Sequence, residues 1–460
     1  MKLLEFKDVD FSYESYTDEK ARPVFSSVSF HVETKENILI LGDPGVGKST
    51  IASISCALTP KFASGTLTGL ASLKGTNIEK LEPYDLTSTI SLVPQNAASF
   101  IITTLVTDEI AYPLESLCLK REEITKRIQY SLSFWGLEEL KEVNTFQLSG
   151  GETRRLMLSV NEAINPELTI YDESFDDLDI FYRGKLRDKI AKRETSSVVL
   201  ASHFTKWYKG LFDRIYKFEK GTLVETREAD LPKELESLSP LIIKESPNKS
   251  VFEAKEIKYS QKRKSTGSVF NLSVPSFSIE SGEIVALVGL NGSGKSTFSR
   301  LAVGLEEPLS GQFYLEGKAI NGKIRKRNIG YFYQNPDFQI FLPTVKDELS
   351  YGLSFLKLSE EKKESLLEET AKLFNLKLTD TATLLSYGKR KTLQAAIYYL
   401  LNRKFYILDE IDSALSYTEA RNIISLLSQK GAGILLISHD REFATTFASK
   451  VYKIENGVLR

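Results

Sequence analysis

The sequence predicts an α/β protein built from two tandem halves, each with a mostly parallel sheet at its core. Two glycine-rich segments give the first indication, since residues 42–50 (GDPGVGKST) and 289–297 (GLNGSGKST) each follow a short apolar run. The chain also repeats itself with a period of about 240 residues. Within each half, short apolar runs alternate with longer amphipathic stretches. That alternation is typical of parallel strands covered by helices on both faces of a sheet.

Matching residues in the two halves define the repeat and its boundaries. We expect a first domain over residues 1–228, a linker over 229–248 and a second domain over 249–460. The stretch between the halves is polar, contains prolines and lacks a sustained hydrophobic period, as connectors do. The matching pairs are Tyr13 with Tyr259, Lys48 with Lys295, Asp172 with Asp409, and His203 with His439.

The composition is that of an ordinary globular protein. It argues against a protein that binds nucleic acid through overall charge and against one that spans a membrane. The chain has 460 residues, 42% of them apolar, and a formal net charge of −1. It therefore has no overall basic field to attract nucleic acid. No stretch approaches the roughly 20 apolar residues of a membrane-spanning helix, and we expect no signal sequence in the first residues, MKLLEFKDVDF. Two cysteines suit a reducing compartment. If the protein works at a membrane, we expect it to dock there on another chain.

The two glycine-rich segments fit the pattern G-x-x-x-x-G-K-[ST] of a phosphate-binding loop. Glycines let main-chain N–H groups turn toward phosphate oxygens, the lysine reaches the outer phosphates, and the hydroxyl holds Mg²⁺. Two such loops, each between an expected strand and an expected helix, predict a nucleoside triphosphate ligand with Mg²⁺. The residues concerned are Gly42, Gly45, Gly47, Lys48, Ser49 and Thr50, and Gly289, Gly292, Gly294, Lys295, Ser296 and Thr297.

An acidic pair ends a later apolar run in each half. LTIYDE ends in Asp172 and Glu173, and FYILDE ends in Asp409 and Glu410. We expect the aspartate of each pair to hold the Mg²⁺ shell and the glutamate to polarise an attacking water. The carboxyl ends of parallel strands are where open α/β sheets bind ligands, which favours this reading.

Histidines and glutamines extend the predicted sites. His203 and His439 each end an apolar run, after VVLAS and GILLIS, and that position suits contact with a terminal phosphate. The third histidine, His31, we interpret as an ordinary strand residue. Gln95 and Gln334 follow short strands between the phosphate loop and the acidic pair. Each glutamine is either plain polar surface or a contact to the metal and the water.

A serine–glycine turn precedes a helix in each half. The segment LSGGE at 148–152 contains Ser149, Gly150 and Gly151, and a helix mouth of this kind is a second anion site. The simpler interpretation is a helix N-cap. The second half has LSYGK at 385–389, with Ser386 and Gly388 kept and Tyr387 in the place of a glycine.

With these segments assembled, the chain resembles the ATP-binding cassette ATPases over essentially its whole length. In that resemblance the glycine-rich loops are Walker A motifs, the acidic pairs end Walker B motifs, and the glutamines are Q-loop residues. LSGGE and LSYGK resemble signature motifs, and His203 and His439 resemble switch histidines. The family implies two P-loop NTPase domains, each with an antiparallel β subdomain and a helical subdomain that carries the signature.

The resemblance also assigns ligands. It implies ATP bound by the loop and signature residues, with Tyr13 and Tyr259 stacked on adenine. It implies Glu173, Glu410, His203, His439, Gln95 and Gln334 as catalytic residues. The residues expected to hold Mg²⁺ are Ser49, Asp172 and Gln95 in one half, and Ser296, Asp409 and Gln334 in the other.

A narrower resemblance rests on QNPDFQIFLPTVKDELSYG, at residues 334–352. It is similar to a segment in the ATPases of energy-coupling factor (ECF) importers, which take up vitamins and transition metals. This implies a transmembrane coupling subunit and a solute-binding membrane subunit as partners, and a place on the cytoplasmic face of the cell membrane. The alternatives are a soluble tandem-cassette ATPase that acts on ribosomes or DNA, and the ATPase of a sugar importer. We expect no nucleic-acid partner.

In the family, two cassettes close head to tail on two ATP molecules, so no homodimer is required here. We expect one site to combine Lys295 and Glu410 with LSGGE, and the other to combine Lys48 and Glu173 with LSYGK. A tyrosine ring does not fit where a glycine lets main chain approach phosphate. We therefore expect the LSYGK site, which also has Ser416 where the first half has Asp179, to turn over more slowly.

Overall fold

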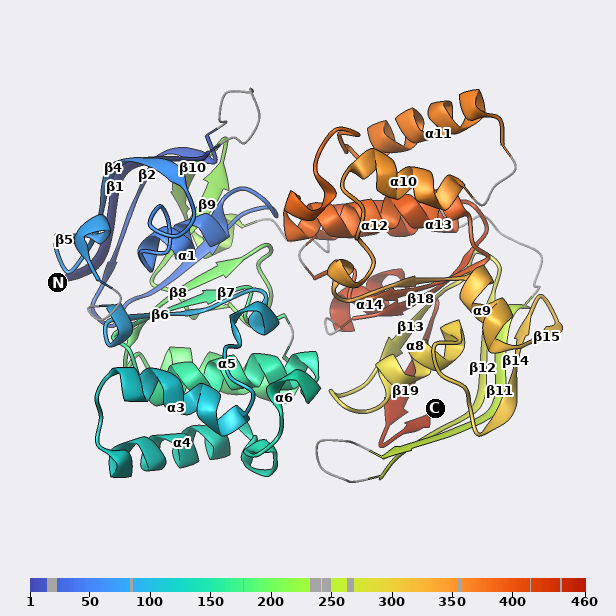
Figure 1. The fold of residues 1–460 in the computed structure, drawn as a ribbon, viewed down its shortest axis with the longest axis horizontal. Coiled ribbons are helices and arrows are strands. Elements are labelled where there is room, and N and C mark those ends of the chain that lie inside the picture. The colour runs from blue at the N-terminus through green and yellow to red at the C-terminus, as the bar shows by residue number, and fades with distance from the viewer. Residues whose placement is uncertain are drawn as a thin grey trace. The chain divides into compact units, whose positions relative to one another are not determined.

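The computed structural model describes residues 1–14, 23–82, 86–176, 178–231, 241, 250–262, 269–354, 358–413, 415–438 and 441–460. The chain divides into two compact units (Figure 1). The first includes Met1–Lys233, and the second includes Glu234–Arg263 and Ser268–Arg460. Most of the expected linker, and His439, lie outside the described residues. The exact domain boundaries therefore stay a prediction.

The first unit contains two sheets. A four-stranded antiparallel sheet has the order β2-β1-β4-β5, with β1 (Lys2–Tyr13), β2 (Phe25–Glu33), β4 (Gly65–Leu73) and β5 (Thr76–Asn77). A six-stranded sheet has the order β10-β9-β3-β8-β7-β6, with β3 (Asn37–Leu41), β6 (Ile90–Val93), β7 (Leu168–Asp172), β8 (Ser196–Ala201), β9 (Arg214–Glu219) and β10 (Thr222–Thr226). In this sheet only the β9–β10 pair is antiparallel.

Most helices of the first unit gather on one side of the parallel sheet. The helices α3, α4 and α5 pack into one group with α6 nearby, and α1 lies between the two sheets (Figure 1). Their bounds are α1 Lys48–Ser55, α3 Val106–Ser116, α4 Arg121–Trp135, α5 Gly150–Ile164 and α6 Ile180–Ala191. The helix α4 ends at Gly136, whose φ of 63° is a left-handed conformation that favours glycine.

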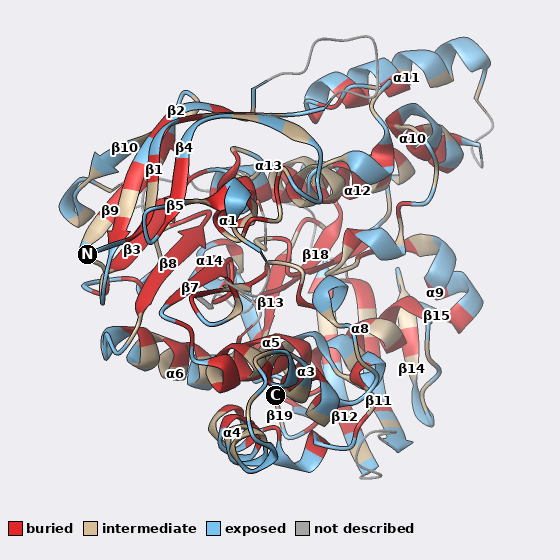
Figure 2. Cartoon of the chain, turned by 60° about the vertical axis from the view of Figure 1, so that its left-hand side comes forward, coloured by how far each residue is buried: buried red, intermediate tan, exposed pale blue. Residues whose placement is uncertain are grey.

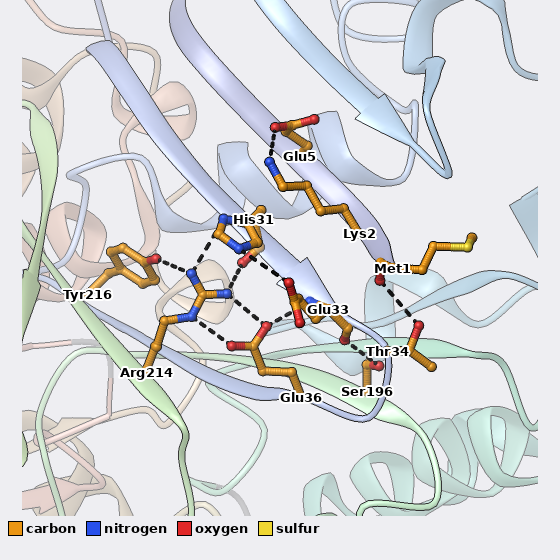
Figure 3. A network of polar contacts seen from close by, with 10 residues as sticks. All are labelled: Met1, Lys2, Glu5, His31, Glu33, Thr34, Glu36, Ser196, Arg214 and Tyr216. Carbon is orange, nitrogen blue, oxygen red and sulfur yellow. Dashed lines mark hydrogen bonds and ion pairs between the residues drawn. The ribbon is translucent and has the colours of Figure 1, made fainter.

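A polar network joins the antiparallel sheet of the first unit to its parallel sheet (Figure 3). Arg214 on β9 makes a two-point ion pair with Glu36, at 2.6 and 2.8 Å, and donates to the main-chain oxygen of His31 at 2.8 Å. Its guanidinium also reaches the hydroxyl of Tyr216. His31 lies on β2, as expected from the sequence, and serves this structural junction.

The second unit joins both kinds of strand pairing in one ten-stranded sheet. Its order is β15-β14-β11-β12-β20-β19-β13-β18-β17-β16. The antiparallel part holds β11 (Ser250–Lys262), β12 (Val269–Glu280), β14 (Ser310–Leu315) and β15 (Lys318–Ile320). The short β20 (Val458–Leu459) pairs with β12 and with β19 (Lys450–Glu455). The parallel part holds β13 (Ile284–Val288), β16 (Ile329–Phe332), β17 (Phe405–Asp409) and β18 (Gly433–Ile437).

The helices of the second unit repeat those of the first. A group made of α10, α11 and α12 lies on one side of the parallel strands (Figure 1). The bounds are α8 Lys295–Val303, α9 Gly322–Asn328, α10 Val345–Leu353, α11 Glu360–Leu373, α12 Tyr387–Leu401, α13 Tyr417–Ser428 and α14 Arg441–Phe447. On α9, the buried Arg325 forms an ion pair with Glu307 at 2.8 Å.

The central parallel strands are the buried core of each unit, as the apolar runs predict. Every residue of β3, β7, β8, β17 and β18 is buried. Figure 2 shows β3, β7, β8 and β18 mostly in red. Within the described part of the chain, no helix is both long enough and apolar enough to span a bilayer. The predicted fold class is confirmed, because each unit has parallel strands, an antiparallel β part and a helical part.

Candidate functional site: two phosphate loops and their acidic pairs

Each phosphate loop connects a buried parallel strand to a helix. In the first unit the loop runs from the end of β3 to the start of α1, and Gly47 at the helix mouth has a φ of 107°. A Cβ atom there would lie 2.8 Å from Val24 Cγ1, so both the backbone and the space require glycine. In the second unit Gly294 has a φ of 117° at the start of α8. Gly45 and Gly292 are also left-handed, at 83° and 74°.

The two loop lysines fold over their own loops in the same way. The ammonium of Lys48 donates to the main-chain oxygens of Gly42 at 2.6 Å and Asp43 at 3.2 Å. The ammonium of Lys295 donates to Gly289 at 2.8 Å and Leu290 at 3.2 Å. Both lysines are thus held at the loop, where an outer phosphate would sit in a phosphate loop of this type. Ser49, Thr50, Ser296 and Thr297 form the first turns of the following helices.

The acidic pair of the first unit lies beside its phosphate loop. Asp172 is the last residue of β7, and Glu173 follows it with a left-handed φ of 49°. This turn brings the Glu173 carboxylate within 3.3 Å of Lys48 Nζ. Ser202, just beyond β8, donates to the same carboxylate from its hydroxyl at 2.6 Å and from its N–H at 3.1 Å. Because β3, β7 and β8 are neighbours, their carboxyl ends form one site.

The acidic pair of the second unit is held differently. Asp409 ends β17 and accepts a hydrogen bond from the Tyr331 hydroxyl at 2.9 Å. Glu410 follows with a φ of 52°, the same turn as in the first unit. Its carboxylate accepts a 2.6 Å hydrogen bond from the side-chain amide of Gln334. In the second unit the predicted Q-loop glutamine and the predicted catalytic glutamate are therefore in direct contact.

Burial changes the acidity of groups at these strand ends. Desolvation, and then the neighbouring Glu173 charge, raise the pKa of Asp172 to about 6, although a hydrogen bond from Ser49 and the Lys48 charge oppose the shift. Desolvation and the adjacent Asp409 carboxylate also raise the pKa of Tyr331, so its hydroxyl stays a donor. A buried carboxyl with a strongly shifted pKa marks a candidate functional site.

The chemistry at Asp172 fits a Mg²⁺ ion. Its Oδ1 atom is buried and has no hydrogen-bond partner among the described residues, which leaves an oxygen for a ligand. The described residues contain no group of three or more His, Cys, Asp or Glu side chains able to hold a metal alone. Mg²⁺ bound to a nucleotide needs only one or two carboxylates beside the phosphates, so Asp172 with Ser49 suffices. Bound Mg²⁺ would neutralise phosphate charge.

Two further predicted catalytic residues follow parallel strands of the first unit. Gln95 follows β6, which pairs with β7, and His203 is buried just after β8. His439 lies outside the described residues, directly after β18 and Ser438. The sheet thus places Gln95 and His203 after the two strands that flank β7 in the first unit, while their roles in catalysis stay predictions.

Both signature segments begin helices, and both serines cap them. Ser149 forms a capping box with Glu152 at the start of α5, where Gly150 and Gly151 are the first two residues. Ser386 accepts from the N–H of Lys389 at 3.4 Å at the start of α12, which includes Gly388. The simpler interpretation, a helix N-cap, is therefore correct for both serines. It leaves the anion-binding role as a prediction.

Tyr387 makes a contact that its position in the sequence does not indicate. Its hydroxyl donates a 2.9 Å hydrogen bond to the main-chain oxygen of Gln334, in the Q-loop of the same unit. In the first unit, Arg154 on α5 makes the equivalent contact and reaches the main-chain oxygens of Pro94 and Gln95. No local pattern reveals either contact, because each spans more than 50 residues of sequence.

The two predicted adenine-stacking tyrosines have different surroundings. The Tyr13 hydroxyl lies 3.1 Å from Thr50 Oγ1, which places this side chain beside the phosphate-loop helix. Burial and a hydrogen bond to Glu306 raise the pKa of Tyr259 to about 12. Stacking on adenine stays a prediction for both residues.

Two buried glutamates were not recognised as functional in the sequence. Glu109 accepts from the N–H groups of Ile102 at 3.1 Å and Thr103 at 2.7 Å. Glu348 likewise accepts from the N–H groups of Phe341 and, at 2.6 Å, Leu342. Each glutamate thus holds the loop that follows the Q-loop of its unit by hydrogen bonds from two main-chain N–H groups. The shared letters DE, in TLVTDE and PTVKDE, were the available signal.

The fold and these paired sites define a tandem P-loop ATPase, and comparison with known proteins gives the family. The sequence profile of the family described as "ABC transporter" matches residues 25–176 and 272–413. The chain therefore belongs to the ABC transporter family and carries two cassettes. Membership of this family implies ATP-hydrolysing activity, with ATP and normally Mg²⁺ bound by each cassette. We call the two units the first and the second cassette.

Relatives span almost the whole chain. A Treponema denticola protein described as "Putative ABC transporter ATP-binding protein" is 26% identical over 100% of this chain and 96% of its own length. A Bacillus subtilis protein described as "Putative HMP/thiamine import ATP-binding protein YkoD" is 30% identical over 98% of this chain and 89% of its own length. A solved structure of an archaeal ribosome recycling factor, in complex with a stalk protein, has a TM-score of 0.63 at 19% identity. The match covers 98% of this chain and 89% of the recycling-factor chain. At this level of identity it shows a shared fold and nothing further.

Proposed function

We propose that this chain is the energising ATPase of an ECF-type membrane importer for a small solute such as a vitamin or a metal ion. The observation that carries the proposal is the 30% identity, over 98% of this chain, to a relative described as an import ATP-binding protein. The ECF-like segment from Gln334 to Gly352 supports the narrower class. The likeness to a ribosome recycling factor concerns the fold and favours no ribosomal role.

In this proposal each ATP is bound by residues of both cassettes. One site uses Lys295, Asp409 and Glu410 together with the LSGGE turn that contains Ser149. The other uses Lys48, Asp172 and Glu173 together with the LSYGK turn that contains Ser386. Fusion in one chain supplies the partner cassette at an effective concentration of about mM for a short linker. ATP binding closes the pair, and hydrolysis reopens it.

Within a site, each residue has a separate task. The loop lysine binds the outer phosphates, and Ser49 with Asp172, or Ser296 with Asp409, hold Mg²⁺. The glutamate orients and polarises the attacking water, and the glutamine joins the metal shell to the following loop. The switch histidine, His203 or His439, contacts the terminal phosphate. The intact residue set around Glu410, paired with LSGGE, makes this site the faster one.

The proposed docking surface for the membrane partner follows the Q-loop. In the second cassette Phe338 and Phe341 are 77% and 64% exposed, whereas Ile340 between them is buried. Phe341 packs edge-on against the exposed Tyr351, with ring centroids 5.7 Å apart. In the first cassette Ile102 is 70% exposed at the matching place. Exposed apolar side chains gathered at one place favour a protein-binding surface.

The buried Glu348 supports this surface because it fixes the loop that presents the aromatic rings. Its carboxylate accepts hydrogen bonds from the N–H groups of Phe341 and Leu342. Without it, water would be their remaining hydrogen-bond acceptor. A rigid apolar loop binds with a smaller loss of conformational entropy than a mobile one. Glu109 has the same function in the first cassette.

Co-purification from membranes tests the proposed function. We would express the tagged chain with the membrane subunits encoded beside it and purify it in detergent. The proposal predicts a stable complex that Phe338→Asp and Phe341→Asp disrupt while ATPase activity of the isolated chain persists. Leu309→Asp, at an equally exposed apolar position in the antiparallel part of the second cassette, is the matched control. Co-sedimentation with ribosomes and no membrane complex would contradict the proposal.

A further inference from the structure

We infer that Tyr387, the residue that makes the second signature irregular, is a positioning residue for Glu410 of its own cassette and acts through Gln334. The inference rests on the proposed function only in taking Glu410 as the glutamate that polarises water. It assigns to Tyr387 a role in hydrolysis, where the sequence pattern indicates only a lost glycine.

Two hydrogen bonds in series carry the inference. The Tyr387 hydroxyl, at the start of α12, donates to the main-chain oxygen of Gln334 at 2.9 Å. The side-chain amide of Gln334 donates to Glu410 Oε2 at 2.6 Å. Tyr387 therefore holds the main chain of the residue whose side chain orients the carboxylate. Both bonds lie inside the second cassette, so neither depends on the first.

The first cassette makes the same link to its Q-loop with a different residue. Gly150 stands at the position of Tyr387 and has no side chain, and the contact to the Gln95 oxygen comes from Arg154, four residues later. In the second cassette the residue four positions after Tyr387 is Lys391, whose ammonium contacts the main-chain oxygen of Glu410 instead. Residues four apart lie on the same face of a helix.

In the second cassette the link to the Q-loop therefore starts one helical turn earlier on the same helix face than in the first. Lys391, at the position of Arg154, contacts Glu410. Tyr387, one turn earlier, contacts the Q-loop carbonyl. The Lys391 ammonium lies 5.8 Å from the centre of the Tyr387 ring, so the two side chains share this face. Both contacts converge on Glu410, one through Gln334 and one through its own carbonyl. On this basis Tyr387 supplies in the second cassette the Q-loop contact that Arg154 supplies in the first.

The inference makes a prediction opposite to that of the sequence pattern. If Tyr387 were only an obstacle at the helix mouth, its replacement by glycine would restore the family pattern and raise turnover. If Tyr387 positions Gln334, glycine removes the link and lowers turnover. Tyr387→Phe keeps the ring and removes only the hydroxyl, so it isolates the hydrogen bond. Tyr399→Phe is the matched control, because Tyr399 lies on the same helix and its ring packs on Phe374.

ATPase kinetics of the full chain over a range of ATP concentrations test the inference. We expect Tyr387→Phe to lower kcat about fivefold, the effect of one lost hydrogen bond, with KM for ATP almost unchanged. Tyr387→Gly should lower kcat at least as far, and Tyr399→Phe should match the unmodified protein. In a Gln334→Ala background, Tyr387→Phe should have no further effect, because both act on the same carboxylate.

Three results would overturn the inference. They are a higher kcat in Tyr387→Gly, an additive loss in the Gln334→Ala background, and equal kinetics of Tyr387→Phe and Tyr399→Phe. Thermal unfolding of each variant shows whether a lower kcat results from a loss of folded protein. The variant Glu410→Gln distinguishes a failure of the role inferred for Tyr387 from a failure of the proposed function of the site. If it abolishes turnover while Tyr387→Phe is silent, only the inference fails; if Glu410→Gln itself is silent, the proposed function of the site fails.

Discussion

The ammonium group of Lys48 lies 3.3 Å from the carboxylate of Glu173, and the two side chains are only 6% and 5% exposed. Lys48, the predicted phosphate-binding residue of the first cassette, and Glu173, its predicted water-polarising residue, thus form a buried ion pair. Ser202 adds two hydrogen bonds to the same carboxylate. If Lys48 binds the outer phosphates as proposed, nucleotide binding draws it from Glu173 to phosphate, and this exchange contributes to the energetics of the first site.

We expect Lys48→Met to destabilise the nucleotide-free protein. Removal of one partner from a buried ion pair leaves an uncompensated charge, which costs about 3 kcal/mol. The midpoint of thermal unfolding should fall, and the added change Glu173→Gln should recover part of the loss because it removes the charge. Lys61→Met, whose partner Glu82 is largely exposed, is the control and should have little effect. Equal loss in both single variants would contradict the buried pair.

We expect Asp172→Asn to stabilise the nucleotide-free protein, and to do so more at pH 7.5 than at pH 5. The pKa of Asp172 is raised from 3.8 to about 6, so the folded state binds the proton more tightly than the unfolded state. The cost of the ionised carboxyl therefore appears as the pH rises above 3.8 and is complete above about 6, where it reaches about 3 kcal/mol. Asparagine cannot ionise and avoids this cost.

Thermal unfolding of Asp172→Asn at the two pH values, without nucleotide, measures this difference. Asp188→Asn, on the surface helix α6, is the control. A gain in stability that is the same at both pH values would show that the Asp172 carboxyl does not titrate in this range.

We expect Glu348→Ala to loosen the loop that carries Phe338 and Phe341. The change leaves the N–H groups of Phe341 and Leu342 without their carboxylate acceptor. Limited proteolysis should cut this loop faster, and the complex with membrane subunits should weaken. Glu364→Ala is the control, because Glu364 makes an exposed ion pair with Lys346. If both variants are cut at the rate of the unmodified protein, Glu348 does not hold the loop.

The sequence was sufficient to predict the fold class and the two pairs of segments, phosphate loop and acidic pair, that lie at the ends of the parallel strands. The spacing in GDPGVGKST and GLNGSGKST requires left-handed glycines between a strand and a helix, and the structure has them at Gly47 and Gly294. The acidic pairs fall at the ends of buried strands because parallel strands align their carboxyl ends. These features are set locally or by sheet topology, so a single sequence reveals them.

The contacts that distinguish the two cassettes were not predictable in this way. In the sequence, Tyr387 is seen only as a replacement of the glycine expected in a signature motif. The hydrogen bond from its hydroxyl to the Gln334 carbonyl is seen only in the folded chain. The pairing of Glu173 with Lys48 and of Glu410 with Gln334 depends on side-chain rotamers in a crowded, buried space. Such choices are decided by packing between segments far apart in sequence.

We propose that this chain holds two unequal ATP sites and that the faster one is built on Glu410. The test is to measure steady-state ATPase rates of Glu410→Gln and Glu173→Gln side by side with the unmodified chain. Loss of the water-polarising group costs about 10²–10⁴ in rate. The account predicts that Glu410→Gln nearly abolishes turnover while Glu173→Gln keeps a substantial part of it. An equal loss in the two variants, or a larger loss in Glu173→Gln, would contradict it.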